Sequence, residues 1–179
     1  MGRLIIFLLS FFDFLHKRKI KNFLIKNKFK NLNTIFDIGA HKGESINFFL
    51  NYFNVLKIIS FEASPENYEK LYLKLPSFVK KFKDTKIIIE NIGLGFKEGI
   101  YDFNQLEETS SSTFNEINMN SNYYKKKSKI LNFFSKKKSQ KIIHINIITL
   151  DKYMSENNIE NIDLIKIDTE GFEFDVIKG

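Results

Sequence analysis

The chain has 179 residues, a length that fits one domain with a hydrophobic core of its own. It contains 20 Phe but neither Trp nor Cys, which excludes a disulfide framework and any metal site ligated by cysteine. The net charge of +7 comes from two segments without acids, because residues 14–36 carry seven Lys or Arg and residues 117–150 carry eight Lys. Such segments contact phosphates or anionic membranes in some proteins, and in others they only keep the surface soluble.

The N-terminal segment, residues 1–33, is predicted to be helical and separate from the domain that follows. Residues 4–15 are nearly all apolar, but these twelve residues are too few to span a bilayer as a helix, which needs about 20. No small-residue cleavage site follows, so a cleaved signal peptide is not expected. We expect one or two helices over residues 4–29. They either pack against the domain and cover its cleft, or form a peripheral membrane anchor through phenylalanines and lysines.

A strand, a glycine turn and a helix follow. Thr34–Ile38 is a short run of β-branched and aromatic residues that predicts a buried strand, with Asp37 near its end. Gly39 and Gly43 allow backbone angles and close approaches that a Cβ would block, and residues 44–54 show apolar side chains at helical spacing. In α/β sheets this arrangement builds a ligand pocket at the carboxyl end of the strands. The Gly-x-x-x-Gly spacing by itself fits a tight turn without a ligand equally well.

The second predicted strand, Val55–Phe61, carries an acidic residue at its tip. Glu62 lies 23 residues after the first glycine of the turn, where a carboxylate is expected to accept hydrogen bonds from both ribose hydroxyls of a nucleoside. Ser64 is a suitable N-cap and Pro65 a suitable first residue for the helix expected to continue over residues 66–75.

The third predicted strand, Lys86–Ile92, is expected to end at Gly93 and Gly95. Asn91 lies near its tip, where an amide could read the edge of an adenine ring or simply cap the strand. Position alone leaves both interpretations open.

The next part of the chain combines two predicted strands with a basic insert. Residues 100–103 and 141–150 are expected to form strands, and Thr149 is expected to N-cap a short helix at 150–157. Between the strands, the lysine-rich insert at 118–140 is low in complexity, which predicts a mobile loop or a loose helix. No spacing that suggests a metal site is found among the three histidines, His16, His41 and His144.

The fourth predicted strand, Ile162–Asp168, ends in two acidic residues around a turn. Asp168 and Glu170 stand at its carboxyl end, and a helix is expected over residues 172–178. In a parallel sheet this end shares one rim with Glu62 and the glycine turn. Three carboxylates on one rim predict a functional site rather than solubilising charge.

Taken together, these segments resemble the FkbM-type S-adenosylmethionine-dependent methyltransferases. The resemblance spans residues 34–179 and leaves out the N-terminal segment and the lysine-rich insert. Its most specific part is the block Ile162-Asp-Leu-Ile-Lys-Ile-Asp-Thr-Glu-Gly-Phe-Glu173. Shorter motifs accompany it in the order of the family, namely Phe36-Asp-Ile-Gly-Ala-His-Lys-Gly43, Phe61-Glu-Ala-Ser-Pro65, Ile148-Thr-Leu-Asp151 and Ile177-Lys-Gly179.

The resemblance implies an α/β fold with a Rossmann-like doubly wound sheet of the class I methyltransferase type, preceded by N-terminal helices. The domain would cover residues 34–179 and would be incomplete at its C-terminus, because the family continues after this block with a helix and further strands. The fourth strand would then expose one edge. We therefore expect marginal stability, association through that edge and weak turnover by this chain alone.

The resemblance also assigns roles to individual residues, with S-adenosylmethionine as the cofactor. Asp168 and Glu170 would lie by the methyl group and the acceptor, where one acts as a general base or, as the less favoured alternative, both ligate Mg²⁺. His41 stands where the family often has Asn, and it still offers a polar ring to the cofactor. The other implied contacts are Asp37, Gly39, Ala40 and Gly43 at the methionine moiety, Glu62 at the ribose and Asn91 near adenine.

The substrates of the family are hydroxyls on sugars and natural products, so the resemblance implies O-methylation of a small molecule or glycan. A cytoplasmic location is expected, with peripheral membrane contact through residues 4–29 as an option. A non-catalytic module that binds RNA or an anionic membrane through the lysine-rich segments is an alternative, although nucleic acid is the less expected partner. A third interpretation is an incomplete gene product without a function.

Overall fold

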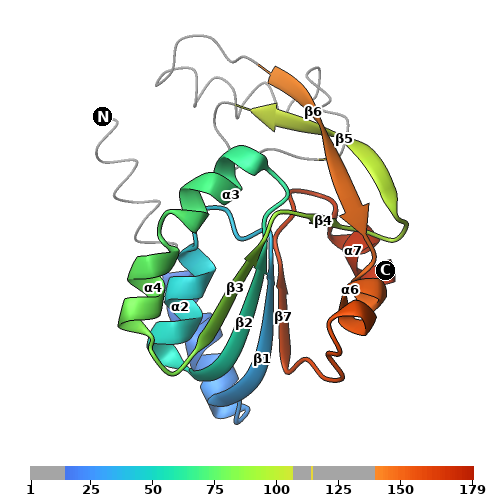
Figure 1. Ribbon diagram of the computed structural model, residues 1–179. Helices are drawn as coiled ribbons and strands as arrows, with labels where there is room; N and C mark the ends of the chain where they lie inside the picture. Colours follow the sequence, from blue (N-terminus) through green and yellow to red (C-terminus); the bar gives the residue numbers. More distant parts are fainter. Residues whose placement is uncertain (1–14, 107–113, 115–139) are drawn as a thin grey trace.

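The computed structural model describes residues 15–106, 114 and 140–179, and its centre is a four-stranded parallel sheet (Figure 1). The strands stand in the order β3-β2-β1-β7, and all three pairings are parallel. Each of the four apolar runs interpreted as a buried strand overlaps one of them, so these four predictions are confirmed. Their bounds are Asn31–Ile38 for β1, Asn54–Phe61 for β2, Lys86–Glu90 for β3 and Leu164–Ile167 for β7.

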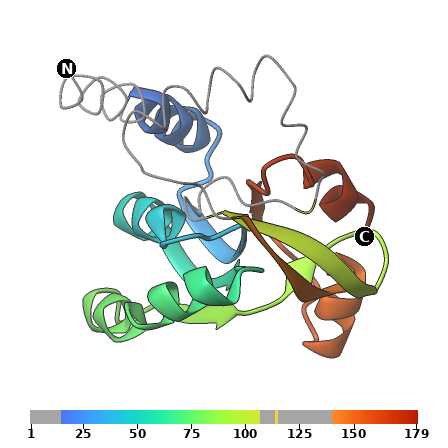
Figure 2. The ribbon, with the colours of Figure 1, turned by 90° about the horizontal axis from the view of Figure 1, so that it is seen from above.

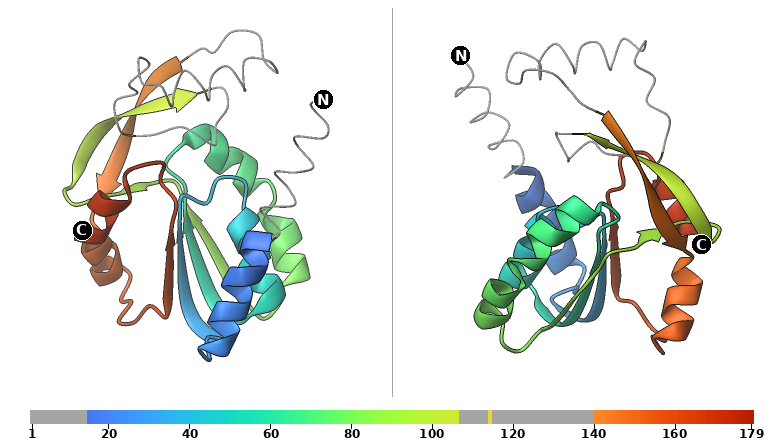
Figure 3. Two further views of the ribbon diagram at one scale, coloured as in Figure 1. Left: turned by 180° about the vertical axis from the view of Figure 1, so that it is seen from behind. Right: turned by 45° about the horizontal axis from the view of Figure 1, so that its top comes forward.

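Helices cover both faces of this sheet, as a doubly wound fold requires (Figure 3). One face packs against residues 15–26 and against α2, α3 and α4, and the other face packs against α6 and α7. The prediction of a Rossmann-like α/β fold is therefore confirmed. The helix bounds are Glu44–Tyr52 for α2, Pro65–Tyr72 for α3, Leu75–Lys81 for α4, Leu150–Glu156 for α6 and Glu173–Lys178 for α7.

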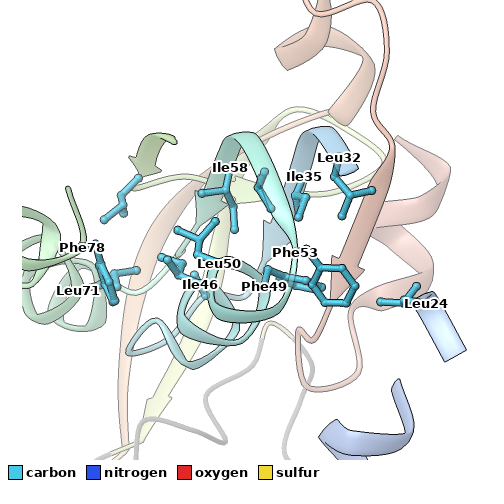
Figure 4. Close-up of a cluster of buried hydrophobic side chains, with 13 residues drawn as sticks. Leu24, Leu32, Ile35, Ile46, Phe49, Leu50, Phe53, Ile58, Leu71 and Phe78 are labelled. Atoms are coloured by element: carbon cyan, nitrogen blue, oxygen red, sulfur yellow. The ribbon is translucent and has the colours of Figure 1, made fainter. Parts of the chain in front are cut away.

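The face under α2, α3 and α4 holds a cluster of buried aliphatic and aromatic side chains (Figure 4). Ile46, Phe49 and Leu50 are the buried residues of α2, and their spacing is the helical periodicity that the sequence shows. They belong to one cluster with Ile35 and Ile58, which are fully buried in β1 and β2. Burying one such side chain contributes about 1.5–3 kcal/mol, so this cluster fixes the helices behind the sheet.

A smaller sheet of three strands lies beyond the carboxyl ends of the parallel strands (Figure 1). Its central strand, β6 (Gln140–Ile148), pairs in parallel with β4 (Gly93–Leu94) and antiparallel with β5 (Gly99–Leu106). Gly93, expected only to end the third strand, thus belongs to a strand of its own. A Cβ on Gly93 would lie 3.0 Å from the Ile147 side chain, so glycine lets β4 approach β6 closely.

The chain after β2 forms two helices where the sequence predicts one. The helix expected over residues 66–75 ends at Tyr72, and α4 begins at Leu75. Pro76 explains the break, because a proline inside a helix lacks an N–H donor and its ring clashes with the preceding turn. The same residue is well suited to the first turn of a new helix, which is its position in α4.

The N-terminal helical prediction is confirmed for residues 15–26, whereas residues 4–14 and most of the insert at 118–140 lie outside the described residues. Within the described part of the chain, no helix is long and apolar enough to cross a membrane. Among the described strands, β7 pairs with β1 alone.

Candidate active site

A cavity of about 380 Å³ opens at the carboxyl ends of β1, β2 and β7. Figure 2 looks onto this edge of the sheet, with the smaller sheet lying across part of it. The parallel arrangement brings together side chains from three strands that are far apart in the sequence. Six of the predicted site residues lie on the cavity wall, namely Gly39, Ala40, His41, Glu62, Asp168 and Glu170.

The turn after β1 is held against both neighbouring strands. The N–H groups of Gly39 and Ala40 both donate to the carbonyl oxygen of Phe61, over 2.9 Å and 3.0 Å. Gly39 has a φ of +77°, and a Cβ at this position would lie 2.0 Å from the carbonyl oxygen of Asp168. Only glycine fits here, because the turn passes so close to the end of β7.

A buried ion pair lies beside this turn. Asp37 is 0% exposed, and its Oδ1 lies 3.1 Å from Nζ of Lys166, its register partner on β7. Burial raises the pKa of the Asp37 carboxyl, against the lowering effect of the Lys166 ammonium. The ammonium also donates to the carbonyl oxygen of Gly39 over 2.8 Å, and Lys166 lies on the cavity wall. Asp37 itself lies behind the wall, where its carboxyl interacts with the wall residues Lys166, Ser45 and Asp168.

Glu62 presents a nearly buried carboxylate at the tip of β2. The residue is 6% exposed, and its Oε2 accepts a hydrogen bond from the N–H of His41 over 2.7 Å. Its Oε1 accepts a second one from the N–H of Ser64 over 2.9 Å. Burial raises the pKa of this carboxyl, while the two N–H groups act to lower it. A carboxylate has about four acceptor positions, and the two N–H groups and the Asn67 side chain use three of them, so the ionised group can accept one further hydrogen bond from a ligand.

A buried amide adjoins this carboxylate on the cavity wall. Asn67 is 2% exposed, and its side chain acts to lower the pKa of Glu62. Its Oδ1 has no hydrogen-bond partner among the described residues. Leaving a buried acceptor unsatisfied costs about 1–3 kcal/mol, so this position suits a ligand that brings a donor into the cavity.

The turn after β7 carries the two acids expected next to the acceptor, Asp168 and Glu170. Glu173 holds this turn, since its Oε1 accepts hydrogen bonds from the N–H groups of Thr169 and Gly171, over 3.0 Å each. Burial alone would raise the pKa of Glu173, but these N–H groups outweigh it and the pKa is lowered. Glu173, the last residue of the most specific motif, therefore shapes the turn.

Two residues on the wall other than glycine have left-handed backbone angles. The φ angle is +48° at His41 and +54° at Glu170. This conformation costs an L-residue about 1–2 kcal/mol, and such strain concentrates at functional sites. Strained backbone therefore marks the turns after both β1 and β7. Beside the first of these turns, a hydrogen bond from His41 lowers the pKa of the Glu44 carboxyl to about 2.

Two other predicted residues, Gly43 and Asn91, do not lie on the cavity wall. Gly43 has a φ of +83°, and a Cβ there would lie 2.8 Å from the Leu71 side chain, so this glycine serves the packing of α2 on α3. Nδ2 of Asn91 donates to the carbonyl oxygen of Glu62 over 2.8 Å, which ties the ends of β2 and β3 together. Ile92 lines the cavity next to it. Contact of Gly43 or Asn91 with a cofactor stays a prediction.

The apolar part of the wall comes largely from outside the parallel sheet. Phe103 on β5 contacts Phe114 at a ring-centroid distance of 4.7 Å, and Phe114 lies 4.9 Å from Phe172, just before α7. Phe103 reaches the cavity only through the pairing of β5 with β6, which no local sequence pattern reveals. Further wall residues not predicted for the site include Lys17, Glu44, Ser45, Asn67, Leu94, Lys166 and Thr169.

The charges on the wall favour a cationic ligand. Its ionisable acids outnumber its ammonium groups, because four carboxylates (Glu44, Glu62, Asp168, Glu170) face two lysines (Lys17, Lys166). Within the residues that the structure describes, no group of three or more His, Asp or Glu side chains is placed to hold a metal ion. The wall therefore suits a polar ligand that carries hydroxyls and a positive charge.

The chain is similar to known methyltransferases. The family model for the methyltransferase FkbM domain matches residues 37–179. A crystal structure of methyltransferase FkbM from Methylobacillus flagellatus KT resembles 82% of this chain with a TM-score of 0.49 and 15% sequence identity, and the match covers 28% of that chain. No curated protein matches. Because the family model covers most of its residues, the chain belongs to the FkbM methyltransferase domain family.

Proposed function

We propose that this chain uses S-adenosylmethionine to transfer a methyl group to a hydroxyl on a sugar or natural product. Membership of the FkbM methyltransferase domain family supports a methyltransferase activity, and this activity, the methyl donor and the acceptor are what we propose. One observation carries the proposal. The nearly buried carboxylate of Glu62, which keeps an acceptor position for a ligand, lies on the same cavity wall as Asp168.

The cavity suits S-adenosylmethionine in size and charge. A volume of about 380 Å³ falls within the range of small-molecule sites. Glu62 would accept a hydrogen bond from a ribose hydroxyl, and Lys166 would bind the carboxylate of the methionine moiety. Gly39 lets the turn after β1 pass close to the end of β7, so that both turns line the same cavity. When bound, S-adenosylmethionine supplies a methyl group activated by a positively charged sulfur, which the acidic wall favours.

Asp168 is the proposed general base. Methyl transfer from a sulfonium requires mainly that the reactants are aligned and water is excluded, but the attacking hydroxyl must also lose a proton. A carboxylate within hydrogen-bond reach can accept it. Asp168 directly follows β7 and its N–H donates to the carbonyl oxygen of Ile38 over 3.0 Å, whereas Glu170 lies on the turn. We therefore assign proton acceptance to Asp168 and positioning of the acceptor to Glu170.

Calorimetric titration with S-adenosylhomocysteine tests the cofactor and its placement. Glu62→Gln should weaken binding about 10- to 150-fold, the equivalent of about 1.5–3 kcal/mol for hydrogen bonds to a charged group. Glu69→Gln is the matched control, because Glu69 is exposed on α3 next to the site but off its wall. Equal affinities for wild type and Glu62→Gln would refute the placement, and no binding by wild type would refute the cofactor.

The acceptor class needs a separate measurement. Labelled S-adenosylmethionine should pass its methyl group to hydroxyls when the protein is incubated with a panel of sugars and hydroxylated natural products. Label found only on nitrogen, with amine acceptors in the same panel, would overturn the proposal of O-methylation.

A further inference from the structure

The helix at residues 15–26 buries little of its surface against the domain. Leu24, 8% exposed, is its one buried side chain. Phe23 is 66% exposed, while Ile20 and Ile25 are 38% and 42% exposed. Helices in folded proteins are stabilised mainly by packing an apolar face. The outer side of this helix therefore exposes Phe23, with the partly exposed Ile20 about one turn before it, and neither belongs to a described hydrophobic cluster.

The helix lies in a strongly basic part of the chain, residues 14–36, which carries seven Lys or Arg and no acid. Lys19 lies four residues before Phe23 and Lys26 three residues after it, so on a helix both flank its side chain. The surface of an anionic membrane complements these lysines and apolar side chains, because its lipid phosphates lie above an apolar interior. A nucleic acid would match the lysines but would leave aliphatic side chains such as Ile20 in water.

We propose that the helix at residues 15–26 is a docking surface for a membrane that carries anionic phospholipids. Five of these twelve residues are Lys or Arg, a composition that suits the polar interface of a bilayer and not its hydrocarbon core. Phe23 and Ile20 enter the boundary between headgroups and acyl chains, and Lys19 and Lys26 contact lipid phosphates.

Docking through this helix also positions the cavity. Lys17 on the helix lines the cavity, and Nζ of Lys21 lies 4.8 Å from the centre of the Tyr52 ring on α2. A helix with its side chains is about 10–12 Å across. A membrane on the outer side thus holds the cavity about one helix diameter from the lipid surface. The docking itself does not depend on the proposed methyl transfer.

Vesicle flotation with the full chain tests the proposal. The protein should bind vesicles of phosphatidylcholine with about 30% phosphatidylserine, and it should bind vesicles of phosphatidylcholine alone far more weakly. Replacing Lys19 and Lys26 by Gln should lower the partition coefficient about 25-fold, since one lysine near the surface contributes about fivefold. Phe23→Ser should lower it at least about tenfold. The matched control is Phe174→Ser, because Phe174 on α7 is 67% exposed and should leave binding unchanged.

Several outcomes would overturn the docking surface. Equal binding to neutral and anionic vesicles would refute the role of the lysines, and equal effects of Phe23→Ser and Phe174→Ser would refute the role of the helix. Binding to a single-stranded RNA that depends on Lys19 and Lys26, without vesicle binding, would identify a nucleic-acid surface instead. Melting temperatures should show that the variants fold. Their S-adenosylhomocysteine affinity should equal that of wild type, so failure of the cofactor proposal is seen independently.

Discussion

The rim of the parallel sheet and the helical core behind it are held by different interactions. On the rim, backbone N–H groups orient carboxylates, as His41 and Ser64 do for Glu62. In the core, Ile46 and Ile58 are fully buried within a cluster of aliphatic and aromatic side chains. Exposed polar side chains on the rim, such as that of Asp168, can therefore be changed with small effects on folding, whereas buried core side chains cannot. Substitutions in the two regions should separate chemistry from stability.

The largest expected effect is on turnover at the rim. Asp168→Asn keeps the shape of the side chain but removes the base, so methyl transfer from labelled S-adenosylmethionine should fall about 10²- to 10⁴-fold. The melting temperature should stay that of wild type. Asp84→Asn, in the exposed turn before β3, is the control and should leave the rate unchanged. Unchanged turnover in folded Asp168→Asn would remove Asp168 from the reaction.

Lys166→Met should break the separation between rim and core, because Lys166 lies on the cavity wall and pairs with the fully buried Asp37. Removing one partner of a buried ion pair costs about 3–5 kcal/mol of unfolding free energy. Burial already raises the pKa of Asp37, and loss of the ammonium should raise it further, so stability should fall as the pH rises from the ordinary pKa of 3.8 toward the raised one. Denaturant unfolding of wild type and Lys166→Met at several pH values measures this difference in unfolding free energy.

The control for that substitution is the double variant Asp37→Asn/Lys166→Met. It removes the uncompensated charge and should recover part of the lost stability. If Lys166→Met alone were as stable as wild type at neutral pH, the ion pair would have no role in holding the turn after β1.

In the core, Ile46→Ala should lower the unfolding free energy by about 2–5 kcal/mol, because it leaves a cavity under α2. The folded fraction should still bind S-adenosylhomocysteine like wild type, since Ile46 is not on the cavity wall. Ile177→Ala is the matched surface control, with Ile177 68% exposed, and should change stability by less than about 0.5 kcal/mol. A large loss of ligand affinity in folded Ile46→Ala would contradict the separation of the two regions.

The smallest expected effect is a pH dependence of ligand binding. Burial raises the pKa of Glu62 above its ordinary value of 4.5, and only the ionised carboxylate offers all its acceptor positions. The affinity for S-adenosylhomocysteine should therefore fall as the pH is lowered from about 7.5 toward that raised pKa. Glu62→Gln should flatten this dependence. If calorimetry shows that the affinity depends equally steeply on pH in wild type and in Glu62→Gln, the titrating group is not Glu62.

The sequence by itself determined the parallel strands, the starts of the helices other than α4, and part of the rim. Strands buried on both faces need continuous apolar runs, which are visible in any short window of the chain. Ser64 and Thr149 accept hydrogen bonds from the N–H groups of Asn67 and Lys152, as predicted for N-caps. The left-handed backbone at Gly39 is likewise a local feature that the sequence predicts. All of these depend on residues a few positions apart, and so their chemistry can be read directly from the chain.

Only the tertiary structure decided the rest of the site. Lys166 is one lysine in an apolar strand until the register of β1 with β7 sets it opposite Asp37. Phe103 reaches the cavity wall because β5 pairs with β6. These contacts join residues that are distant in sequence, and the packing of the whole chain selects them. Local conformational preferences carry no information about such pairs, because they depend only on neighbouring residues.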